Sequence, residues 1–587
     1  MFKLIKNFKK KDWLLIIVSI VLIVMQVWLE LKMPDYMSKV TVLVQTEGSK
    51  MSEILKNGGF MLLCAFGSLV GAVIVGYLIA LLASGFSRNL RSKLFRKVED
   101  MYMSEIKEFS PNSLITRTTN DITQVEMFIG FGLQLLIKAP VTAVWAITKI
   151  LNKSWEWSMV TAVAVVVLLV VIGILTIIVM PKFKIVQKLT DKLNGVTREN
   201  LTGIRVVRAF NAEEYQQEKF QDVNNSLTNL QLFNQKTMSI MAPVMYLVMY
   251  MLTLVIYFIG AYLIKDALMA DKIGLFGDMV VFSSYAMQII MSFLMLAMIF
   301  MILPRAQVSA SRINEVLDTS VSVIDGNVET KSEVGTIEFK NVSFKYPDAE
   351  EYVLKNISFK ANKGDTVAFI GSTGSGKSTL VNLIVRFYDV TDGEILIDGV
   401  NIKDYKLEYL YKLIGYVPQR AVLFNGTVNS NISYGEAMEK ISDKKIVEAS
   451  KVAQADEFIS KMDDGYESHI AQGGTNISGG QKQRIAISRA IAKNPEIYIF
   501  DDSFSALDYK TDAVLRSELK KYTKDATSLI VAQRIGTIMN ADKIIVLDNG
   551  ESVGVGTHEE LLKSCEVYKQ IALSQLSKEE LDNAKTK

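Results

Sequence analysis

The sequence predicts an all-α transmembrane domain of six helices with long cytoplasmic helical extensions, fused to an α/β domain. Three observations support this fold class. Half of the 587 residues are hydrophobic and the mean hydropathy is +0.24, which is high for a soluble protein. Six long apolar stretches lie before residue 304. Beyond them, strand-like segments alternate with helical segments, which is the pattern of an α/β domain.

Each apolar stretch is close to the roughly 20 residues that a helix needs to cross about 30 Å of hydrocarbon. The stretches are 13–31, 60–83, 127–150, 157–180, 239–264 and 279–303. The first is too long for the core of a cleaved signal peptide, so we expect a membrane helix. The Lys-rich segment before it contains apolar residues that are predicted to lie along the membrane surface, namely Phe2, Leu4, Ile5 and Phe8.

The loops after the second and fourth stretches are long, polar and basic. Basic loops mark the cytoplasmic side, so the N-terminus, both loops and everything after residue 303 are predicted to face the cytoplasm from a plasma membrane. Apolar residues continue at heptad-like spacing through both loops, which predicts that the membrane helices extend toward a cytoplasmic domain. The basic residues are Arg88, Arg91, Lys93, Arg96 and Lys97 in the first loop and Lys182, Lys184, Lys188 and Lys192 in the second.

The composition excludes several classes of function. The net charge is only +3, so no strong positive field favours nucleic acid, and no nucleic-acid partner is expected. The two cysteines, Cys64 and Cys565, provide neither a disulfide framework nor a zinc spacing. The two histidines, His469 and His558, argue against a histidine-based metal site.

A polar segment separates the two predicted domains. Strand-like segments after it are TIEFKNVSFKY, TVAFIG, EILIDG, IGYVPQ, IYIFDD, SLIVAQ and KIIVLDNGE. Their alternation with helical segments predicts a buried parallel sheet. The predicted organisation is a transmembrane domain 1–315, a linker 316–335, a nucleotide-binding domain 336–575 and a tail 576–587.

The segment GSTGSGKST follows a predicted strand and opens a predicted helix, which is the setting of a P-loop. Its glycines let backbone N–H groups surround a phosphate at a helix N-terminus. Lys377 is predicted to contact the β- and γ-phosphates of ATP, and the Ser378 hydroxyl to bind Mg²⁺. The nucleotide-binding residues of this loop are Gly371, Ser372, Thr373, Gly374, Ser375, Gly376, Lys377, Ser378 and Thr379.

The segment ISGGQKQRIAISRA, which begins at Ile477, precedes an apolar, arginine-bearing helix. With its Ser478, Gly479 and Gly480, it resembles the signature motif of ABC-type ATPases, and the resemblance covers the whole chain. In this family two nucleotide domains enclose two ATP molecules. The resemblance therefore implies that the signature, with Gln481, binds the ATP held by the phosphate loop of a second chain.

Four more residues match the family pattern in the expected order. The resemblance implies that Tyr346 in VSFKYPD stacks on adenine and that Asp501 holds the metal. It also implies that Gln419 in YVPQR contacts Mg²⁺ and senses the membrane domain. Asp508, at the end of SALD, matches the loop that crosses to the opposite site.

The membrane half resembles ABC exporters of the type IV, multidrug kind. Segments 113–125 (SLITRTTNDITQV) and 199–215 (ENLTGIRVVRAFNAEEY) are similar to the cytoplasmic segments in which coupling helices dock on nucleotide domains. The chain is therefore identified as a bacterial half-transporter that uses ATP and Mg²⁺. ABC importers resemble it less, because their membrane subunits are usually separate chains.

Two positions depart from the family pattern. Asp502 replaces the glutamate that orients and deprotonates the attacking water, and Gln533 replaces the histidine that contacts the γ-phosphate. The aspartate side chain is one methylene shorter than that of glutamate, so its carboxylate lies about 1.5 Å further back. A displacement of this size is incompatible with near-attack geometry. Loss of general-base assistance slows a reaction by roughly 10²–10⁴-fold. The site on this chain's own phosphate loop is therefore predicted to bind ATP and to hydrolyse it slowly.

The intact signature serves the opposite site, so the asymmetry favours a different partner chain. The departures resemble the degenerate-site subunit of a heterodimeric exporter, whose partner carries the catalytic Glu and His and an altered signature. Gln472, where exporters usually have Glu, is a further departure that is expected to weaken contact with the partner's coupling helix. The remaining alternatives are export of lipid or peptide and an ATP-gated regulatory or channel-type protein.

Methionines at steps of three or four form a stripe on each of the last two predicted spans. Such side chains adapt to varied apolar ligands, and Tyr285 and Gln288 lie near the second stripe. These stripes are compatible with a promiscuous cavity wall for amphipathic compounds and with ordinary helix packing. The stripes are Met238, Met241, Met245 and Met249, and Met287, Met291, Met295, Met298 and Met301.

Glu30 and Lys138 are ionisable residues within or at the ends of predicted spans. A charge in lipid is costly, so both are functional candidates. Lys138 lies mid-span beside Pro140, where a kink or a cytoplasmic cavity would hydrate it. Glu30, near the outer end, is predicted to reach water or to pair with Lys32.

Overall fold

The computed structural model describes residues 2–151, 155–268, 271–435 and 440–575. The chain divides into a helical unit, Met1–Glu99 with Asn112–Thr319, and an α/β unit, Asp100–Pro111 with Ser320–Lys587. The predicted tail 576–587 lies outside the described residues, as do the side chains of Phe2, Lys184 and Met301.

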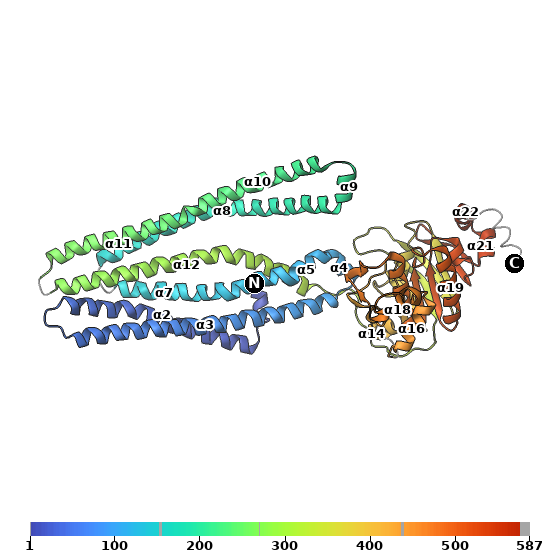
Figure 1. Ribbon diagram of the computed structural model, residues 1–587, viewed down its shortest axis with the longest axis horizontal. Helices are drawn as coiled ribbons and strands as arrows, with labels where there is room; N and C mark the ends of the chain where they lie inside the picture. The colour runs from blue at the N-terminus through green and yellow to red at the C-terminus, as the bar shows by residue number, and fades with distance from the viewer. Residues whose placement is uncertain (1, 152–154, 269–270, 436–439, 576–587) are drawn as a thin grey trace. The chain divides into compact units, whose positions relative to one another are not determined.

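Among the described residues, six helical segments are long and apolar enough to cross a membrane (Figure 1), which confirms the prediction. Each also continues well beyond its apolar stretch, as expected of long helical extensions. The segments are Lys10–Gln45, Met51–Glu99, Pro111–Leu151, Trp155–Thr202, Glu213–Asp266 and Lys272–Asp318. Their helices are α2 (Lys10–Gln45), α3 (Met51–Glu99), α5 (Pro111–Thr116), α6 (Ile122–Met127), α7 (Leu133–Leu151), α8 (Trp155–Thr202), α10 (Glu213–Ser239), α11 (Met241–Asp266) and α12 (Lys272–Asp318).

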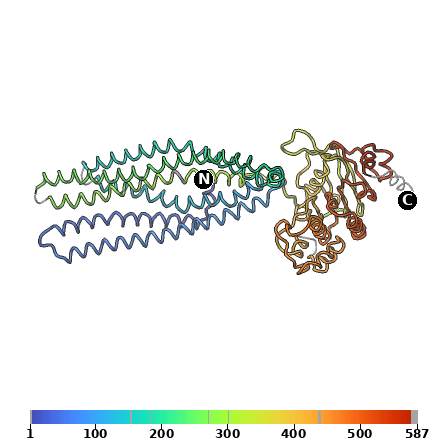
Figure 2. The backbone as a smooth tube through the Cα atoms, turned by 45° about the horizontal axis from the view of Figure 1, so that its top comes forward, coloured from blue at the N-terminus to red at the C-terminus, as the bar shows by residue number. Residues whose placement is uncertain are grey.

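Within the helical unit, neighbouring helices pair along their length. Helices α2 and α3 run side by side, as do α8 and α10 (Figures 1 and 2). A core of buried side chains joins α2, α3, α7, α8, α11 and α12, and Val27, Trp157 and Phe282 are almost fully buried in it. Burial of apolar surface contributes roughly 25 cal/mol per Å² only where side chains leave water. Apolar side chains within a membrane are already out of water, so contacts between these helices depend there on side-chain packing.

The structure corrects the prediction for two residues of the N-terminal segment, Leu4 and Phe8. Helix α1 spans only Phe2–Ile5, and Leu4 is 2% exposed. The Phe8 ring lies 4.7 Å from the ring of Phe86 on α3, measured between centroids. Leu4 is therefore enclosed within the helical unit, and Phe8 makes an aromatic contact with α3 instead of lying along a membrane surface.

The α/β unit contains a six-stranded sheet in the order β12-β11-β3-β10-β9-β6. Strand β3 pairs in parallel with β10 and β11, and β9 pairs in parallel with β6 and β10, as the alternating pattern predicts. Strand β12 is antiparallel to β11. The strands are β3 (Thr366–Gly371), β6 (Ile414–Val417), β9 (Ile497–Asp501), β10 (Thr527–Val531), β11 (Lys543–Asp548) and β12 (Glu551–Gly556).

A second, antiparallel sheet corrects part of the prediction. TIEFKNVSFKY and EILIDG provide β1 and β4, which pair with each other in an antiparallel sheet of order β2-β1-β4-β5. The burial of β2 alternates along the strand, so one of its faces is solvated, whereas all five residues of β9 are buried. The strands are β1 (Ile337–Phe344), β2 (Leu354–Ala361), β4 (Asp392–Ile397) and β5 (Val400–Asn401), and a further pair is β7 (Gly426–Thr427) with β8 (His469–Ile470).

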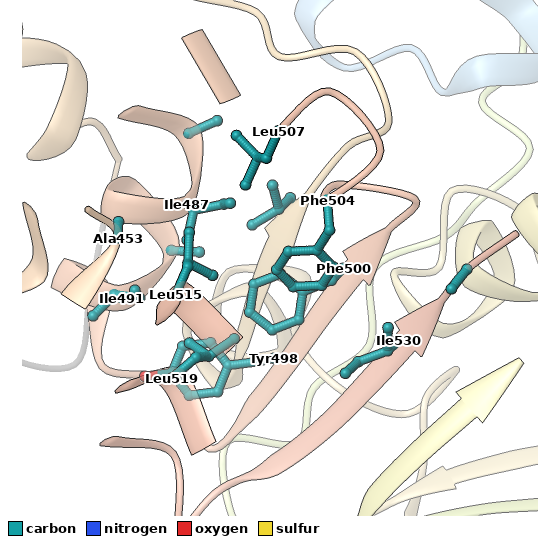
Figure 3. Close-up of a cluster of buried hydrophobic side chains, with 14 of the residues drawn as sticks. Ala453, Ile487, Ile491, Tyr498, Phe500, Phe504, Leu507, Leu515, Leu519 and Ile530 are labelled. Atoms are coloured by element: carbon teal, nitrogen blue, oxygen red, sulfur yellow. The ribbon is translucent and has the colours of Figure 1, made fainter. Parts of the chain in front are cut away.

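The helices of the α/β unit pack on these sheets and fix the ends of the strands. Figure 3 shows Tyr498 and Phe500 of β9 among Ile487, Leu515 and other side chains from the neighbouring helices. This packing holds the carboxyl end of β9 in place. The helices are α4 (Met103–Phe109), α13 (Lys377–Ile384), α14 (Leu407–Leu413), α15 (Val428–Ile432), α16 (Asp443–Val452), α17 (Asp456–Ile459), α18 (Gly479–Lys493), α19 (Tyr509–Tyr522), α20 (Ile535–Ile538), α21 (His558–Ser564) and α22 (Glu566–Gln575).

The polar segment 316–335 is helical up to Asp318, where α12 ends, and from Ser320 it belongs to the α/β unit. Val323 is buried in the core of that unit. Asp325 accepts a hydrogen bond from the backbone N–H of Leu407 at 2.7 Å. The segment beyond Asp318 is therefore part of the α/β unit and not a free tether.

Candidate functional site

The segment GSTGSGKST forms the turn between β3 and α13. A Cβ atom on Gly371 would lie 2.0 Å from the carbonyl oxygen of Leu547, so only glycine fits there. Gly376 has φ of +96° and would place a Cβ 2.6 Å from Leu354. These two glycines let the backbone fold closely enough for its N–H groups to surround an anion at the start of α13.

Lys377 begins α13 and folds back over the loop. Its Nζ donates hydrogen bonds to the carbonyl oxygens of Gly371 at 2.9 Å and Ser372 at 2.7 Å. Burial lowers the pKa of Lys377, against the opposing effect of Asp502 and Asp501. A triphosphate would bring negative charge next to this ammonium group, and the contact of Lys377 with the β- and γ-phosphates stays a prediction.

Ser378 and Asp501 form the oxygen-rich edge of the site. The Ser378 hydroxyl donates to Oδ1 of Asp501 at 3.3 Å. Burial raises the pKa of Asp501, and the nearby charge of Asp502 raises it further. A carboxylate and a hydroxyl on adjoining elements are ligands suited to Mg²⁺, so these residues fit the predicted metal.

Asp502 is held by two amide side chains. Its Oδ2 accepts hydrogen bonds from Nε2 of Gln533 at 2.8 Å and from Nε2 of Gln419 at 3.2 Å. Its backbone φ is +47°, a conformation that residues other than glycine seldom adopt. Burial raises the pKa of Asp502. The structure thus brings together Asp502, Gln533 and Gln419, and it directs the amide of Gln419 toward Asp502.

Tyr346 follows β1 and adjoins the phosphate loop. Its hydroxyl lies 3.0 Å from the Oγ1 of Thr379. Its ring meets the rings of Phe344 and Tyr388 edge to face, at centroid distances of 5.0 and 5.2 Å. These contacts hold the aromatic ring next to the loop, as an adenine-stacking role requires.

The signature segment forms the N-terminus of α18. The Ser478 hydroxyl accepts a hydrogen bond from the backbone N–H of Gln481, whose side chain accepts one from the backbone N–H of Ser478. Gly479 and Gly480 are the first two residues of the helix, and Ser478 and Gly479 are exposed. This capping box presents a helix N-terminus to an anion.

Asp508 also caps a helix, α19. Its Oδ1 accepts a hydrogen bond from the backbone N–H of Thr511 at 3.0 Å. That hydrogen bond lowers the pKa of Asp508. Gln472 lies exposed in the turn before the signature.

The helical unit pairs Glu30 with Lys138, which overturns the prediction that Glu30 reaches water or pairs with Lys32. Lys138 Nζ lies 2.9 Å from Glu30 Oε1, and Gln26 and Ser68 also donate hydrogen bonds to that oxygen. Lys32 instead lies 4.0 Å from Asp35. Helix α2 and helix α7 bring Glu30 and Lys138 together because each side chain faces the interior of the bundle, where an unpaired charge is costly.

We did not predict a second charged cluster from the sequence. Lys149 Nζ on α7 lies 2.7 Å from Asp35 Oδ2 on α2. Tyr285 donates hydrogen bonds to Asp35 Oδ1 at 2.5 Å and to the carbonyl oxygen of Leu31 at 2.9 Å. The predicted first span ended at Leu31, but α2 continues through Pro34 to Gln45 and carries Asp35 into the bundle. Tyr285 is fully buried, so its hydroxyl is not free for a ligand.

The two methionine stripes differ in exposure. Met245 on α11 belongs to the buried core of the helical unit, and Met241 packs against that core. Met291 and Met298 on α12 are each 46% exposed. Part of the α11 stripe therefore packs in the core. The interpretation of the stripes as a cavity wall for amphipathic compounds applies mainly to α12.

The structure places the first contact segment of the α/β unit earlier in the chain than the predicted coupling segment 113–125. Residues 113–125 pack within the helical unit, where Arg117 Nη1 lies 2.9 Å from Glu315 of α12. The part of this loop that joins the α/β unit is Asp100–Pro111, which contains α4. Ser110, with φ of +59°, ends α4, and Pro111 starts the next helix. The segment 199–215 contains α9 (Ile204–Ala209), as a coupling helix requires.

Comparisons with known proteins match both halves of the chain. A model of the ABC transporter transmembrane region matches residues 14–293, and a model of the ABC transporter family matches residues 354–505. An uncharacterized ABC transporter ATP-binding protein of Mycobacterium tuberculosis is 39% identical over 523 residues, which cover 88% of this chain and 87% of that protein.

Two further similarities concern exporters. An ATP-dependent lipid A-core flippase of Pseudomonas aeruginosa is 33% identical over 497 residues, which cover 84% of this chain and 80% of that protein. The structure of a bacterial Atm1-family ABC exporter with ATP bound has a TM-score of 0.80, with 97% of this chain and 100% of that chain covered. At 24% identity, this last similarity concerns the fold.

Proposed function

Because the chain belongs to the ABC transporter family, we propose that it is one subunit of a heterodimeric exporter of hydrophobic and amphipathic compounds. The chain is a half-transporter of exporter architecture, with membrane helices and an ATPase domain fused in one multi-pass membrane protein. In the proposal, the exporter uses ATP and Mg²⁺ in a bacterial plasma membrane, and the α/β unit and the N-terminus face the cytoplasm.

The observation that carries the proposal is the environment of Asp502. Two amide groups donate hydrogen bonds to the same carboxylate oxygen, Oδ2, and one of them, Gln533, stands where a histidine is expected. Burial raises the pKa of Asp502 and so makes it a stronger base. Its short side chain opposes this effect, since a misplacement of about 1 Å costs about 10²-fold in rate. The chain's own site is therefore proposed to hold ATP and turn it over slowly.

A partner chain is also supported by the tip of the helical unit. Around α9, apolar side chains are exposed to solvent, and Phe210 is 79% exposed. An apolar cluster at the end of a long helical extension is suited to dock on another protein domain. The intact signature of this chain is proposed to complete the active site of a partner that carries the catalytic Glu and His. The exposed cluster is Leu201, Ile204, Val206 and Phe210.

The hydrophobic and amphipathic character of the proposed compounds is inferred from the exposed side chains of α12. Met291 and Met298 expose flexible thioether side chains, which adapt to apolar ligands of different shape. The half-buried ion pairs Glu30–Lys138 and Asp35–Lys149 join α2 to α7, and in this proposal the apolar surface of α12 is the adaptable wall.

The test is ATP turnover by the full-length chain, purified alone and together with the half-transporter that copurifies from its native membrane. We expect the chain alone to bind ATP and hydrolyse it slowly, and the pair to hydrolyse it faster in the presence of an amphipathic dye. A chain that alone forms a symmetric dimer with rapid, dye-stimulated phosphate release would overturn the heterodimer.

The double substitution Asp502→Glu with Gln533→His tests the slow site directly. The substitutions restore the longer carboxylate side chain and the imidazole at the chain's own site. ATP turnover at that site of the heterodimer should therefore rise by about 10- to 100-fold. The control is Asp502→Asn, which should leave the already slow rate almost unchanged. A large loss of turnover in Asp502→Asn would mean that Asp502 is an effective base.

Lipid export is a second candidate, favoured by the 33% identity to a protein named as a lipid A-core flippase. In reconstituted vesicles, a lipid exporter would move a fluorescent phospholipid between leaflets on addition of ATP. An exporter of soluble amphipathic compounds would instead accumulate dye inside inverted vesicles and leave the phospholipid distribution unchanged.

A further inference from the structure

The short helix α4 lies in the chain between two membrane-capable segments but belongs to the α/β unit. Several contacts anchor it there. Glu105, 5% exposed, accepts hydrogen bonds from the backbone N–H groups of Tyr102 and Ser322. The Ser104 hydroxyl lies 2.8 Å from the hydroxyl of Ser322. Tyr102 packs against the core that contains β1 and β3.

The last turn of this anchored helix carries a lysine above the predicted adenine-stacking ring. Lys107 Nζ lies 4.7 Å from the centroid of the Tyr346 ring and 5.6 Å from that of Tyr388. Among the described residues, no hydrogen bond or ion pair holds this ammonium group. Its position is therefore set by two aromatic faces, which attract a cation.

The same ring leads to the phosphate loop. The Tyr346 hydroxyl is 3.0 Å from Thr379, the last residue of GSTGSGKST. A purine on the Tyr346 face that Lys107 occupies must displace the ammonium group, because two groups cannot share one face of a ring. Displacement requires movement of Lys107 alone or of α4 with it, and α4 is continuous in the chain with the helices on either side.

We propose that Lys107 competes with the adenine base for Tyr346 and thereby reports purine binding to α4. The inference rests on the proposed binding of ATP at this site. It makes Lys107 a positioning residue that lowers affinity for the purine nucleotide and leaves affinity for the phosphates untouched. It also predicts that base binding, and not phosphate binding alone, changes the environment of α4.

The test compares ADP with inorganic tripolyphosphate, which carries phosphates without a base. Binding of each to the full-length chain in detergent is measured by calorimetry for the unsubstituted chain, Lys107→Ala and Lys107→Arg. A cation–π contact at an exposed site corresponds to about a two- to fivefold change in affinity. We expect Lys107→Ala to bind ADP about two- to fivefold more tightly, with unchanged tripolyphosphate affinity, and Lys107→Arg to resemble the unsubstituted chain.

Lys345→Ala is the matched control, because Lys345 is the neighbour of Tyr346 in sequence but its Nζ lies over a different ring, that of Tyr352, at 5.8 Å. This control should change neither affinity. Unchanged or weakened ADP binding in Lys107→Ala, or an equal shift for tripolyphosphate, would overturn the proposed competition. Failure of the unsubstituted chain to bind ADP would instead overturn the nucleotide site itself. Melting temperatures of the variants verify that each is folded.

Discussion

The two units treat buried charge in opposite ways. In the helical unit each of two interior carboxylates has a lysine within 2.9 Å, in the pairs Glu30–Lys138 and Asp35–Lys149. In the α/β unit the adjacent carboxylates Asp501 and Asp502 share the influence of one lysine, Lys377.

The pKa values of the α/β unit express this difference. Burial raises the pKa of both Asp501 and Asp502 and lowers that of Lys377, so all three charged forms are disfavoured at once. A bound metal ion would offset the negative charge of the two aspartates, and a bound triphosphate would offset the positive charge of Lys377. Charges paired within the fold therefore serve the architecture, whereas under-compensated charges indicate where a charged ligand is expected to bind.

The largest effect is expected at Lys377. Substitution by alanine removes a charged donor from the phosphate loop, and hydrogen bonds to charged groups contribute about 1.5–3 kcal/mol. We therefore expect Lys377→Ala to weaken ADP binding by about 10- to 100-fold in calorimetry. The exposed lysine of α19, Lys520, provides the control, and Lys520→Ala should bind ADP normally. Equal affinities in both variants would contradict a ligand role for the under-compensated charges.

A smaller effect is expected from the paired charges of the helical unit. Lys138→Met leaves the Glu30 carboxylate with only the neutral donors Gln26 and Ser68, which should lower stability by about 2 kcal/mol, measured by thermal unfolding in detergent. Adding Glu30→Gln removes the orphaned charge, so the double variant should recover most of the loss. A double variant that is no more stable than Lys138→Met would contradict the view that this pair is an architectural unit.

The smallest effect concerns a second pair of carboxyl groups in the α/β unit that share one lysine. Asp398 is fully buried, and burial raises its pKa to about 6, with the nearby charge of Glu496 adding to the effect. Lys331 forms an ion pair with Glu496. Because the folded pKa exceeds the ordinary value of 3.8, the folded state holds an extra proton between about pH 4 and pH 6, and stability falls as pH rises through this range.

Asp398→Asn removes this loss, since asparagine stays neutral and still accepts the hydrogen bond from the Thr336 N–H. At pH 8 the variant should be more stable, with a melting temperature at least roughly 2–4 °C higher, and at pH 4 it should match the unsubstituted chain. The exposed Asp404 serves as the control, as Asp404→Asn should shift neither value. A gain of the same size at both pH values would exclude titration of Asp398 as its cause.

Much of the architecture could be predicted because its signals are local. Apolar stretches long enough to span a membrane, and strands followed by helices, can be recognised within windows of about 20 residues. The phosphate loop depends on glycines at fixed offsets, and Gly371 and Gly376 do occupy positions where a side chain would collide.

Contacts between distant segments were the part that could not be predicted. The pairing of Glu30 depends on which helix faces it across the bundle, and the sequence suggested the neighbour Lys32 in place of Lys138. For the second ion pair the sequence did contain a signal. Asp35 and Lys149 lie near the same end of two membrane-capable segments, so their opposite charges could have been paired. Nothing local indicated that Lys107 would lie over the Tyr346 ring.

The sequence by itself determined the six membrane-capable helices, the phosphate loop and the departures at Asp502 and Gln533, because each depends on residue type and short-range spacing. Only the tertiary structure decided that Asp502 is held by two amides, that β1 and β4 form a separate antiparallel sheet, and that α4 belongs to the α/β unit. The physical reason is that hydrogen bonds and charge pairs act over a few ångströms, and folding alone sets which residues come that close.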